Sequence, residues 1–256
     1  MTEANTHMRW FEDNADHYEE LATYAADFGQ RLIDFADPAP ATRLLDVGAG
    51  RGAAARAAVA RGCVVTAIDV TPAMVRRLAA DVPEITVRQM DVTRLDFPRG
   101  SFDTVVAADV VEILEDPAAA VAEMRRVLAP GGTVALSVHG ARGRWEWLTR
   151  LAQEFWPAPG PVADAATPAD PAALLAEAGF IELTQRPVAA AVQVPSPSAL
   201  WELLESQMSM AVVETLPAGR AAEFHRRFWA GAEHMHAHGG IVLDHNAILH
   251  RAITPA

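Results

Sequence analysis

From residue 42 onward, short apolar runs alternate with segments whose apolar residues recur at helical spacing. The short runs predict buried strands, and the segments between them predict amphipathic helices. Near-continuous apolar strands separated by helices are typical of a parallel sheet covered on both faces. The sequence therefore predicts an α/β fold. The first five predicted strands lie at residues 43–47, 64–68, 85–90, 102–107 and 133–138.

The predicted helices carry start and stop signals. Thr71-Pro72 and Asp116-Pro117 each place a capping residue before a proline at the first helical position. Pro130-Gly131-Gly132 is expected to end the helix that begins at Asp116 and to turn into the fifth strand. Residues 53–60 and 72–82 form the other helices of this pattern.

The pattern of apolar residues divides the chain into three predicted parts. Residues 1–40 are expected to form an N-terminal helical cap, because their apolar residues recur at helical spacing up to Asp37–Pro40. Residues 41–197 and 239–256 form the predicted core, with a sixth strand within 180–194 and a last strand within 241–253. Residues 198–238 form a predicted helical insertion before the last strand, and 157–168 a predicted loop.

Polar or glycine positions follow five of the strands directly. Such sheets bind ligands at the carboxyl ends of their strands, so these positions are expected to meet at one edge. They are Gly48–Arg51, Asp69, Asp91, Asp109 and His139.

The turn after the first strand is rich in glycine, at positions 48, 50 and 52. Glycine allows a tight turn and the close approach of a ligand to bare backbone, and a helix start offers unpaired N–H groups. Asp69 lies 21 residues after Gly48, where a carboxylate can accept hydrogen bonds from both ribose hydroxyls of an adenosine ligand. The alternative is a solvated aspartate before a helix. A nicotinamide dinucleotide is a rival ligand, but its fingerprint is G-x-G-x-x-G, whereas this turn reads G-x-G-x-G.

Five segments within residues 42–139 together resemble class I S-adenosylmethionine-dependent methyltransferases. The segment that begins at Asp69 is similar to the small-molecule branch that includes the ubiquinone and menaquinone methyltransferases. The five segments are Leu45–Gly52, Asp69–Met74, Met90–Val92, Phe102–Val106 and Leu128–Thr133.

The resemblance implies a Rossmann-like, mostly parallel, seven-stranded sheet with an antiparallel last strand. It also implies S-adenosylmethionine as cofactor, with the methionine and ribose portion in the glycine loop, Asp69 on the ribose and Asp91 at the adenine amino group. The full set of expected cofactor-binding residues is Asp46, Gly48, Ala49, Gly50, Asp69, Val70, Met74, Asp91, Val92, Asp109 and Tyr18.

Three of these residues keep a second interpretation. Asp46 and Asp109 would place negative charge near the cationic end of the cofactor, but either could be structural, and Asp46 could order the glycine loop. Tyr18 is expected either to close over the cofactor or to pack in the core.

The expected chemistry is methyl transfer, in which the enzyme mainly aligns nucleophile, methyl group and sulfur. A hydroxyl or protonated amine acceptor also benefits from a base, and His139 after the fifth strand is the candidate. The alternative is that His139 is a loop histidine with no part in the chemistry.

His234, His236 and His238 could bind a metal, contact substrate or form a plain polar segment. No carboxylate or cysteine completes a motif there, so no metal site is predicted, and His245 and Asn246 are further candidates for the substrate cavity.

The charge and composition of the chain limit the classes of partner that it is expected to bind. A formal net charge of −12 without a basic run argues against binding nucleic acid or anionic membranes. Ala108–Val111 lacks the Asn/Asp-Pro-Pro-aromatic motif expected for methylation of the exocyclic amino groups of nucleic-acid bases, and no Pro-Cys nucleophile is present.

The single cysteine, Cys63, is expected to be a buried thiol. Without a signal peptide or a long apolar run, we expect a soluble cytoplasmic protein, monomeric or homodimeric.

The acceptor is expected to be a small hydrophobic or aromatic molecule, because the insertion carries Trp201, Phe224, Phe228 and Trp229. Two other functions stay open. One is an enzyme of the same fold that catalyses a cyclisation or rearrangement, and the other is a protein that binds the cofactor or a metabolite without turnover.

Overall fold

The computed structural model of the chain describes residues 9, 11–16, 18–21, 24–140, 146–155, 170–206, 213 and 216–256. Within these residues, seven strands form one sheet in the order β3-β2-β1-β4-β5-β7-β6. The strands are β1 (Arg43–Val47), β2 (Val64–Asp69), β3 (Thr86–Gln89), β4 (Phe102–Ala108), β5 (Leu128–His139), β6 (Ile181–Val194) and β7 (Ile241–Ile253).

Helices separate the strands except between β3 and β4, and the N-terminal part is largely helical where the structure describes it. The helices are α2 (Tyr18–Leu21), α3 (Ala25–Ala36), α4 (Ala53–Ala60), α5 (Pro72–Asp81), α6 (Pro117–Val127), α7 (Glu146–Phe155), α8 (Pro171–Glu177), α9 (Pro197–Ser206) and α10 (Ala218–Ala237). A 3₁₀ turn, η1 (Val111–Ile113), follows β4.

The strand directions confirm the predicted fold class. β1 is parallel to β2 and β4, β2 is parallel to β3, and β4 is parallel to β5. β7 is antiparallel to β5, with pairs from Thr133↔Ile253 to His139↔Ala247. The sheet is therefore Rossmann-like and mostly parallel, with an antiparallel last strand.

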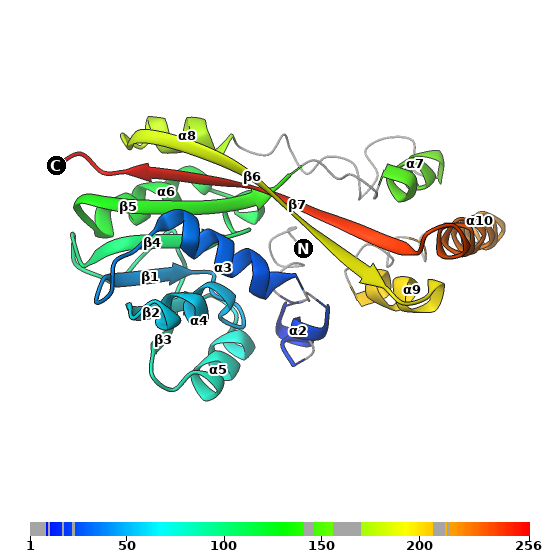
Figure 1. Cartoon of the computed structure of the whole chain (residues 1–256), viewed down its shortest axis with the longest axis horizontal. Coiled ribbons are helices and arrows are strands. Elements are labelled where there is room, and N and C mark those ends of the chain that lie inside the picture. The colour runs from blue at the N-terminus through cyan, green and yellow to red at the C-terminus, as the bar shows by residue number, and fades with distance from the viewer. Residues whose placement is uncertain are drawn as a thin grey trace. The chain divides into compact units, whose positions relative to one another are not determined.

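Neighbouring residues of the strands pack on opposite faces, because side chains alternate along a strand. Leu44, Val106 and Ala135 pack with residues of α3 and α4. Leu45 and Val105 belong to a second cluster, which includes residues of α6 and α8. Figure 1 shows β1, β4 and β5 stacked in this order, with α3 and α4 beside β1. Both faces of the sheet are thus covered, and ligand access is left to the strand ends.

Two local predictions differ from the structure. β5 begins at Leu128, directly after α6, so Pro130-Gly131-Gly132 lies within the strand rather than before it. The pairing with β4 shifts register between Phe102 and Thr104, which accommodates the proline and glycines. Thr71 is the N-cap of α5, but its side chain bonds the Asp69 carboxylate instead of capping the helix.

The chain divides into two compact units. The first comprises Met1–Gly140, Ala169–Val188 and Ala247–Ala256, and the second Ala141–Pro168 and Ala189–Asn246. The second unit extends beyond the predicted insertion at 198–238 on both sides, and the predicted loop at 157–168 lies outside the described residues.

The second unit has a hydrophobic core of its own. Phe224 and Phe228 are fully buried there, and the rings of Trp201 and Trp229 pack against Phe228. The aromatic residues predicted to cover the acceptor thus pack against one another. Their role as a cover stays a prediction. Across the described part of the chain, no helix combines the length and the apolar character that crossing a bilayer requires.

Candidate active site

The glycine loop lies at the carboxyl end of β1, and each of its glycines has positive φ: 63° at Gly48, 53° at Gly50 and 86° at Gly52. A side chain would be strained at any of them. A Cβ on Gly48 would collide with Val110, and one on Gly52 with Leu78, whereas one on Gly50 would meet nothing within 4 Å. Two of the glycines are needed for packing, and the third leaves open space for a ligand.

The Asp69 carboxylate lies against this loop at the end of β2. Its Oδ2 accepts a hydrogen bond from the Gly50 N–H at 2.8 Å, and its Oδ1 accepts one from the Thr71 N–H at 2.8 Å. Burial raises the pKa of Asp69, and these backbone N–H groups oppose the rise. Asp69 therefore fixes the loop, and its contact with a ribose stays a prediction.

Asp46 is buried within β1, with 1% of its surface exposed. Burial raises the pKa of Asp46 to about 7, opposed by a hydrogen bond from the Ala55 backbone and increased by the charge of Asp69. Its Oδ2 is buried, and no group in the described residues bonds it. This placement favours the ordering of the loop and α4 over direct contact with a cofactor.

The N-terminal segment is tied to the glycine loop and α5. Arg51 donates to the Ala15 carbonyl at 2.6 Å and also pairs with Asp81. Glu12 accepts a hydrogen bond from the Ala73 N–H at 2.8 Å, which caps α5. The sequence analysis missed both roles, since neither residue lies near its partner along the chain.

Tyr18 lies in this segment, and the charges of both Asp69 and Asp109 act on its hydroxyl group. Burial raises the pKa of Tyr18 to about 12, and the charges of Asp109 and Asp69 add to the effect. Its ring packs beside Phe11 and against the cluster of Ala15, Ala73 and Met74. Tyr18 thus packs against apolar groups, which is one of its two predicted roles, and its closing over the cofactor stays a prediction.

The other expected cofactor residues differ in exposure. Met74 is fully buried, whereas Val70 is 41% exposed beside Asp69. Asp91 is exposed and accepts hydrogen bonds from the N–H and the hydroxyl of Thr93, while Val92 is buried in the sheet core. Ala49 is partly buried and packs near α5. Val70 and Asp91 are therefore the most accessible of these side chains.

Asp109 stands at the end of β4 in the left-handed region, with φ 55°. Its N–H donates to the Ser137 carbonyl at 3.1 Å, and the Ser137 hydroxyl donates to Oδ1 at 2.7 Å. Burial raises the pKa of Asp109, and the charge of His139 opposes the rise. The bonds to β5 hold this carboxylate in place despite its uncommon backbone conformation.

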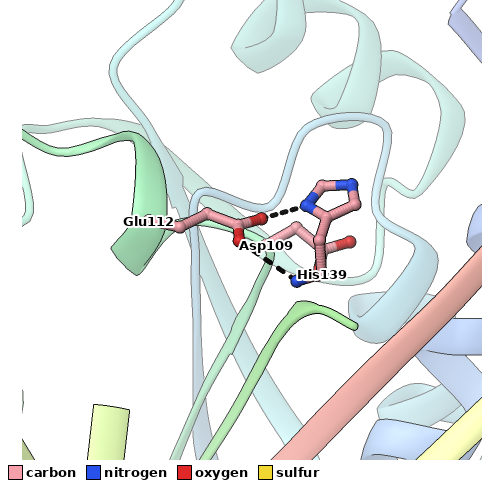
Figure 2. Close-up of side chains that lie close together, drawn as sticks. All are labelled: Asp109, Glu112 and His139. Atoms are coloured by element: carbon pink, nitrogen blue, oxygen red, sulfur yellow. Dashed lines mark hydrogen bonds and ion pairs between the residues drawn. The ribbon is translucent and has the colours of Figure 1, made fainter. Parts of the chain in front are cut away.

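Glu112 on η1 holds His139 at the end of β5. Its carboxylate accepts one hydrogen bond from the His139 N–H at 3.1 Å and a second from ring Nδ1. Figure 2 shows both bonds, with the Asp109 carboxylate beside them. Ligand atoms of Asp109, Glu112 and His139 lie within 4.8 Å of one another. The sequence analysis missed Glu112, because η1 interrupts the strand and helix pattern that located the other residues.

The structure thus groups the predicted residues at two neighbouring places. We call the glycine loop with Asp46 and Asp69 the β1–β2 end, and Asp109, Glu112 and His139 the β4–β5 end. His234 of α10 and His238, which follows the end of this helix, belong to the second unit, where their ring centroids lie 4.2 Å apart. His245 lies on β7, but its side chain is outside the described residues.

Known proteins resemble this chain in sequence over the part that carries the site. The family model described as a methyltransferase domain matches residues 45–136. Nocamycin O-methyltransferase of Saccharothrix syringae is 40% identical over 116 residues, which are 42% of this chain and 41% of that protein. Aklanonic acid methyltransferase DauC of a Streptomyces species is 32% identical over 137 residues, 50% of this chain and 62% of that protein.

The likeness extends to solved structures. The YcgJ protein of Bacillus subtilis superposes with a TM-score of 0.60 at 19% identity, covering 90% of this chain and 99% of that one. At this identity the likeness shows the fold alone. The chain spans about half the length of the relatives it matches.

The matched residues 45–136 run from β1 into β5, so they contain the glycine loop, Asp69 and Asp109. Residues 45–136 therefore form a part of the chain that is similar to a methyltransferase domain.

Proposed function

We propose that the protein transfers a methyl group from S-adenosylmethionine to a small, hydrophobic or aromatic organic acceptor. The observation that carries this proposal is the β1–β2 end, where the Asp69 carboxylate bonds the open backbone of Gly50. The relatives named above methylate small molecules according to their names, which supports the same acceptor class.

The residues of this end suit the cofactor. The space at Gly50 admits a ligand to the backbone, and Asp69 is placed to receive ribose hydroxyls. Exposed Val70 offers an apolar contact for the adenine, and Asp91 an acceptor for its amino group. Bound S-adenosylmethionine would supply an activated methyl group on a cationic sulfur.

The charge of the site also supports a cationic ligand. Burial raises the pKa of Asp69 and of Asp109, so their ionised forms are disfavoured. A nearby positive charge stabilises such carboxylates. Asp109 at the β4–β5 end would then hold the methyl-bearing end of the cofactor, and His139 would take a proton from the acceptor.

The proposal includes a cytoplasmic location and action as a monomer or homodimer. The net charge of −12 and the absence of base-methylation motifs support a small acceptor over a nucleic acid.

Isothermal titration of the whole chain with S-adenosylmethionine tests the cofactor, and release of S-adenosylhomocysteine tests turnover. The acceptors form a panel of phenols, alcohols, amines and carboxylic acids. We expect binding and turnover of at least one acceptor class. Absence of binding at millimolar cofactor would overturn the proposal. Binding without S-adenosylhomocysteine release would favour a non-catalytic binding protein, and conversion of a substrate without methylation would favour a cyclisation or rearrangement.

A further inference from the structure

We propose that Glu112 is a positioning residue that makes His139 a proton acceptor, and that the site is therefore built for an acceptor with a hydroxyl group. This inference rests on the proposed function and deepens it. It starts from the two hydrogen bonds by which one carboxylate holds both the backbone and the ring of His139.

The first bond fixes the place of the histidine. Glu112 accepts from the His139 N–H, so η1 and the end of β5 are joined at the residue that carries the imidazole. Only 13% of the Glu112 side chain is exposed, whereas 48% of the His139 side chain is exposed. The carboxylate is thus the buried partner, and the imidazole is the accessible one.

The second bond fixes the tautomer. A carboxylate accepts hydrogen bonds, so Nδ1 of the neutral imidazole carries the proton and the lone pair lies on Nε2. A carboxylate on Nδ1 also stabilises the imidazolium formed when Nε2 takes a proton. Glu112 therefore both orients the base and lowers the cost of its protonation.

The surrounding charge indicates what gives up that proton. Asp109 lies beside the pair, with its oxygen within 4.8 Å of the other two ligand atoms. On the N-terminal side, burial raises the pKa of Tyr24, and the charges of Tyr18, Asp109 and Glu112 add to the rise. Two carboxylates disfavour an acceptor that arrives as an anion. A neutral hydroxyl can approach, and it needs a base because it is a weak nucleophile until it loses its proton.

The proton transfer is balanced within this pair. The O–H bond of the acceptor breaks, its proton moves to Nε2 of His139, and the electron pair stays on oxygen to form the bond to the methyl carbon. The bond between that carbon and the cationic sulfur would break at the same time, with its electron pair left on sulfur, so that S-adenosylhomocysteine is the leaving group. The imidazolium, paired with Glu112, then passes the proton to water once the products leave.

The test compares Glu112→Gln with the matched control Glu115→Gln, which changes an exposed carboxylate of the same loop. For each variant, kcat/KM is measured against pH with the panel acceptor that the unaltered protein turns over fastest. We expect Glu112→Gln to lower kcat/KM by about 10- to 100-fold and His139→Asn by about 10²-fold or more. Glu112→Asp should recover part of the loss, and Glu115→Gln should match the unaltered protein.

Two readouts separate positioning from a structural role. In Glu112→Gln the acidic limb of the pH profile should move to lower pH, because the imidazolium loses its carboxylate partner. Nitrogen NMR of ¹⁵N-histidine-labelled protein, assigned with His139→Asn, should show the Nδ1–H tautomer in the unaltered protein and a shift towards Nε2–H in Glu112→Gln. Cofactor affinity should stay unchanged in all four variants.

Several results would overturn the inference while leaving the proposed function standing. One is turnover in Glu112→Gln equal to that of the unaltered protein with an unmoved pH profile. Another is a carboxylate or amine as the fastest acceptor, with Glu112 irrelevant to its rate. A third is a loss of activity when a metal chelator is added, with recovery when Mg²⁺, Mn²⁺ or Zn²⁺ is supplied. Asp109, Glu112 and His139 would then act as metal ligands. If the unaltered protein neither binds the cofactor nor releases S-adenosylhomocysteine, the proposed function itself fails.

Discussion

The β1–β2 end and the β4–β5 end both hold buried carboxylates in place, but they do so with different groups. At the β1–β2 end, backbone N–H groups hold the carboxylates, as Gly50 and Thr71 do for Asp69. At the β4–β5 end, backbone N–H groups take part as well, but side chains also bond one another, as Ser137 does with Asp109 and Glu112 with His139. Backbone groups stay in place whatever the neighbouring side chains are, so the first end is fixed by glycine spacing. The second end depends on which side chains meet.

This difference between the two ends matches a division between binding the cofactor and binding the acceptor. A cofactor common to many enzymes can be bound by a fixed backbone frame, whereas acceptors differ and are met by exchangeable side chains. The comparison predicts that changes at the β1–β2 end alter stability and cofactor binding. Changes at the β4–β5 end should alter turnover, as argued above for Glu112.

The largest expected effect concerns the pH dependence of stability through Asp46. The pKa of Asp46 is raised from 3.8 to about 7 in the folded chain, so between these values the unfolded chain has lost a proton that the folded chain retains. Stability therefore falls as pH rises from about 4 to about 7 and levels off above. In Asp46→Asn this pH-dependent loss of stability, on the order of 4 kcal/mol, should vanish. Urea unfolding of both proteins across this range measures the difference, and parallel curves would contradict it.

The next effect contrasts two glycines of one loop. Gly48→Ala should lower the free energy of unfolding by about 2 to 4 kcal/mol, because its Cβ collides with Val110 and its φ is positive. Gly50→Ala should cost only about 1 to 2 kcal/mol, from its φ alone, but it should weaken cofactor binding because its Cβ enters open space. Thermal denaturation and cofactor titration of both variants check the contrast. Equal losses of stability would show that Val110 does not restrict the loop.

A third effect addresses the ribose assignment. Asp69→Ala should weaken the binding of S-adenosylmethionine by about 1 to 3 kcal/mol, as the loss of charged hydrogen bonds does. Asp69→Asn, which keeps a hydrogen-bond acceptor for Gly50, should lose less. Asp96→Asn is the matched control, since Asp96 is an exposed acid paired with Arg88. Titration calorimetry measures all three, and unchanged affinity in Asp69→Ala would remove Asp69 from the cofactor site.

The sequence predicts the sheet and the β1–β2 end well. Apolar runs located all seven strands, and the antiparallel pairing of β7 with β5 confirms the antiparallel last strand implied by the family resemblance. Glycine spacing and the acid after β2 are local signals, because the strand that ends at Asp69 is the next one along the chain. These signals can be read without knowing any tertiary contact.

The remaining parts depend on contacts between distant residues. Glu12 caps α5 across a separation of 61 residues, and Ser137 reaches Asp109 across 28. Neither pairing leaves a periodic or spacing signal. Glu112 sits on a 3₁₀ turn, whose short length gives no helical period, so its bonds to His139 emerge only in three dimensions.

The strand order also bears on how the chain folds during synthesis. β6 lies at the end of the order and joins the sheet only through β7, which is made after it. Until Ile241–Ile253 leave the ribosome, the backbone groups of β6 and of the outer side of β5 have no partner strand in the described sheet. Unpaired strand edges are prone to pair wrongly, and distant pairs such as Thr133↔Ile253 form slowly. Closing the sheet is therefore a late event, and the newly made chain is most exposed to misfolding just before its last strand is released.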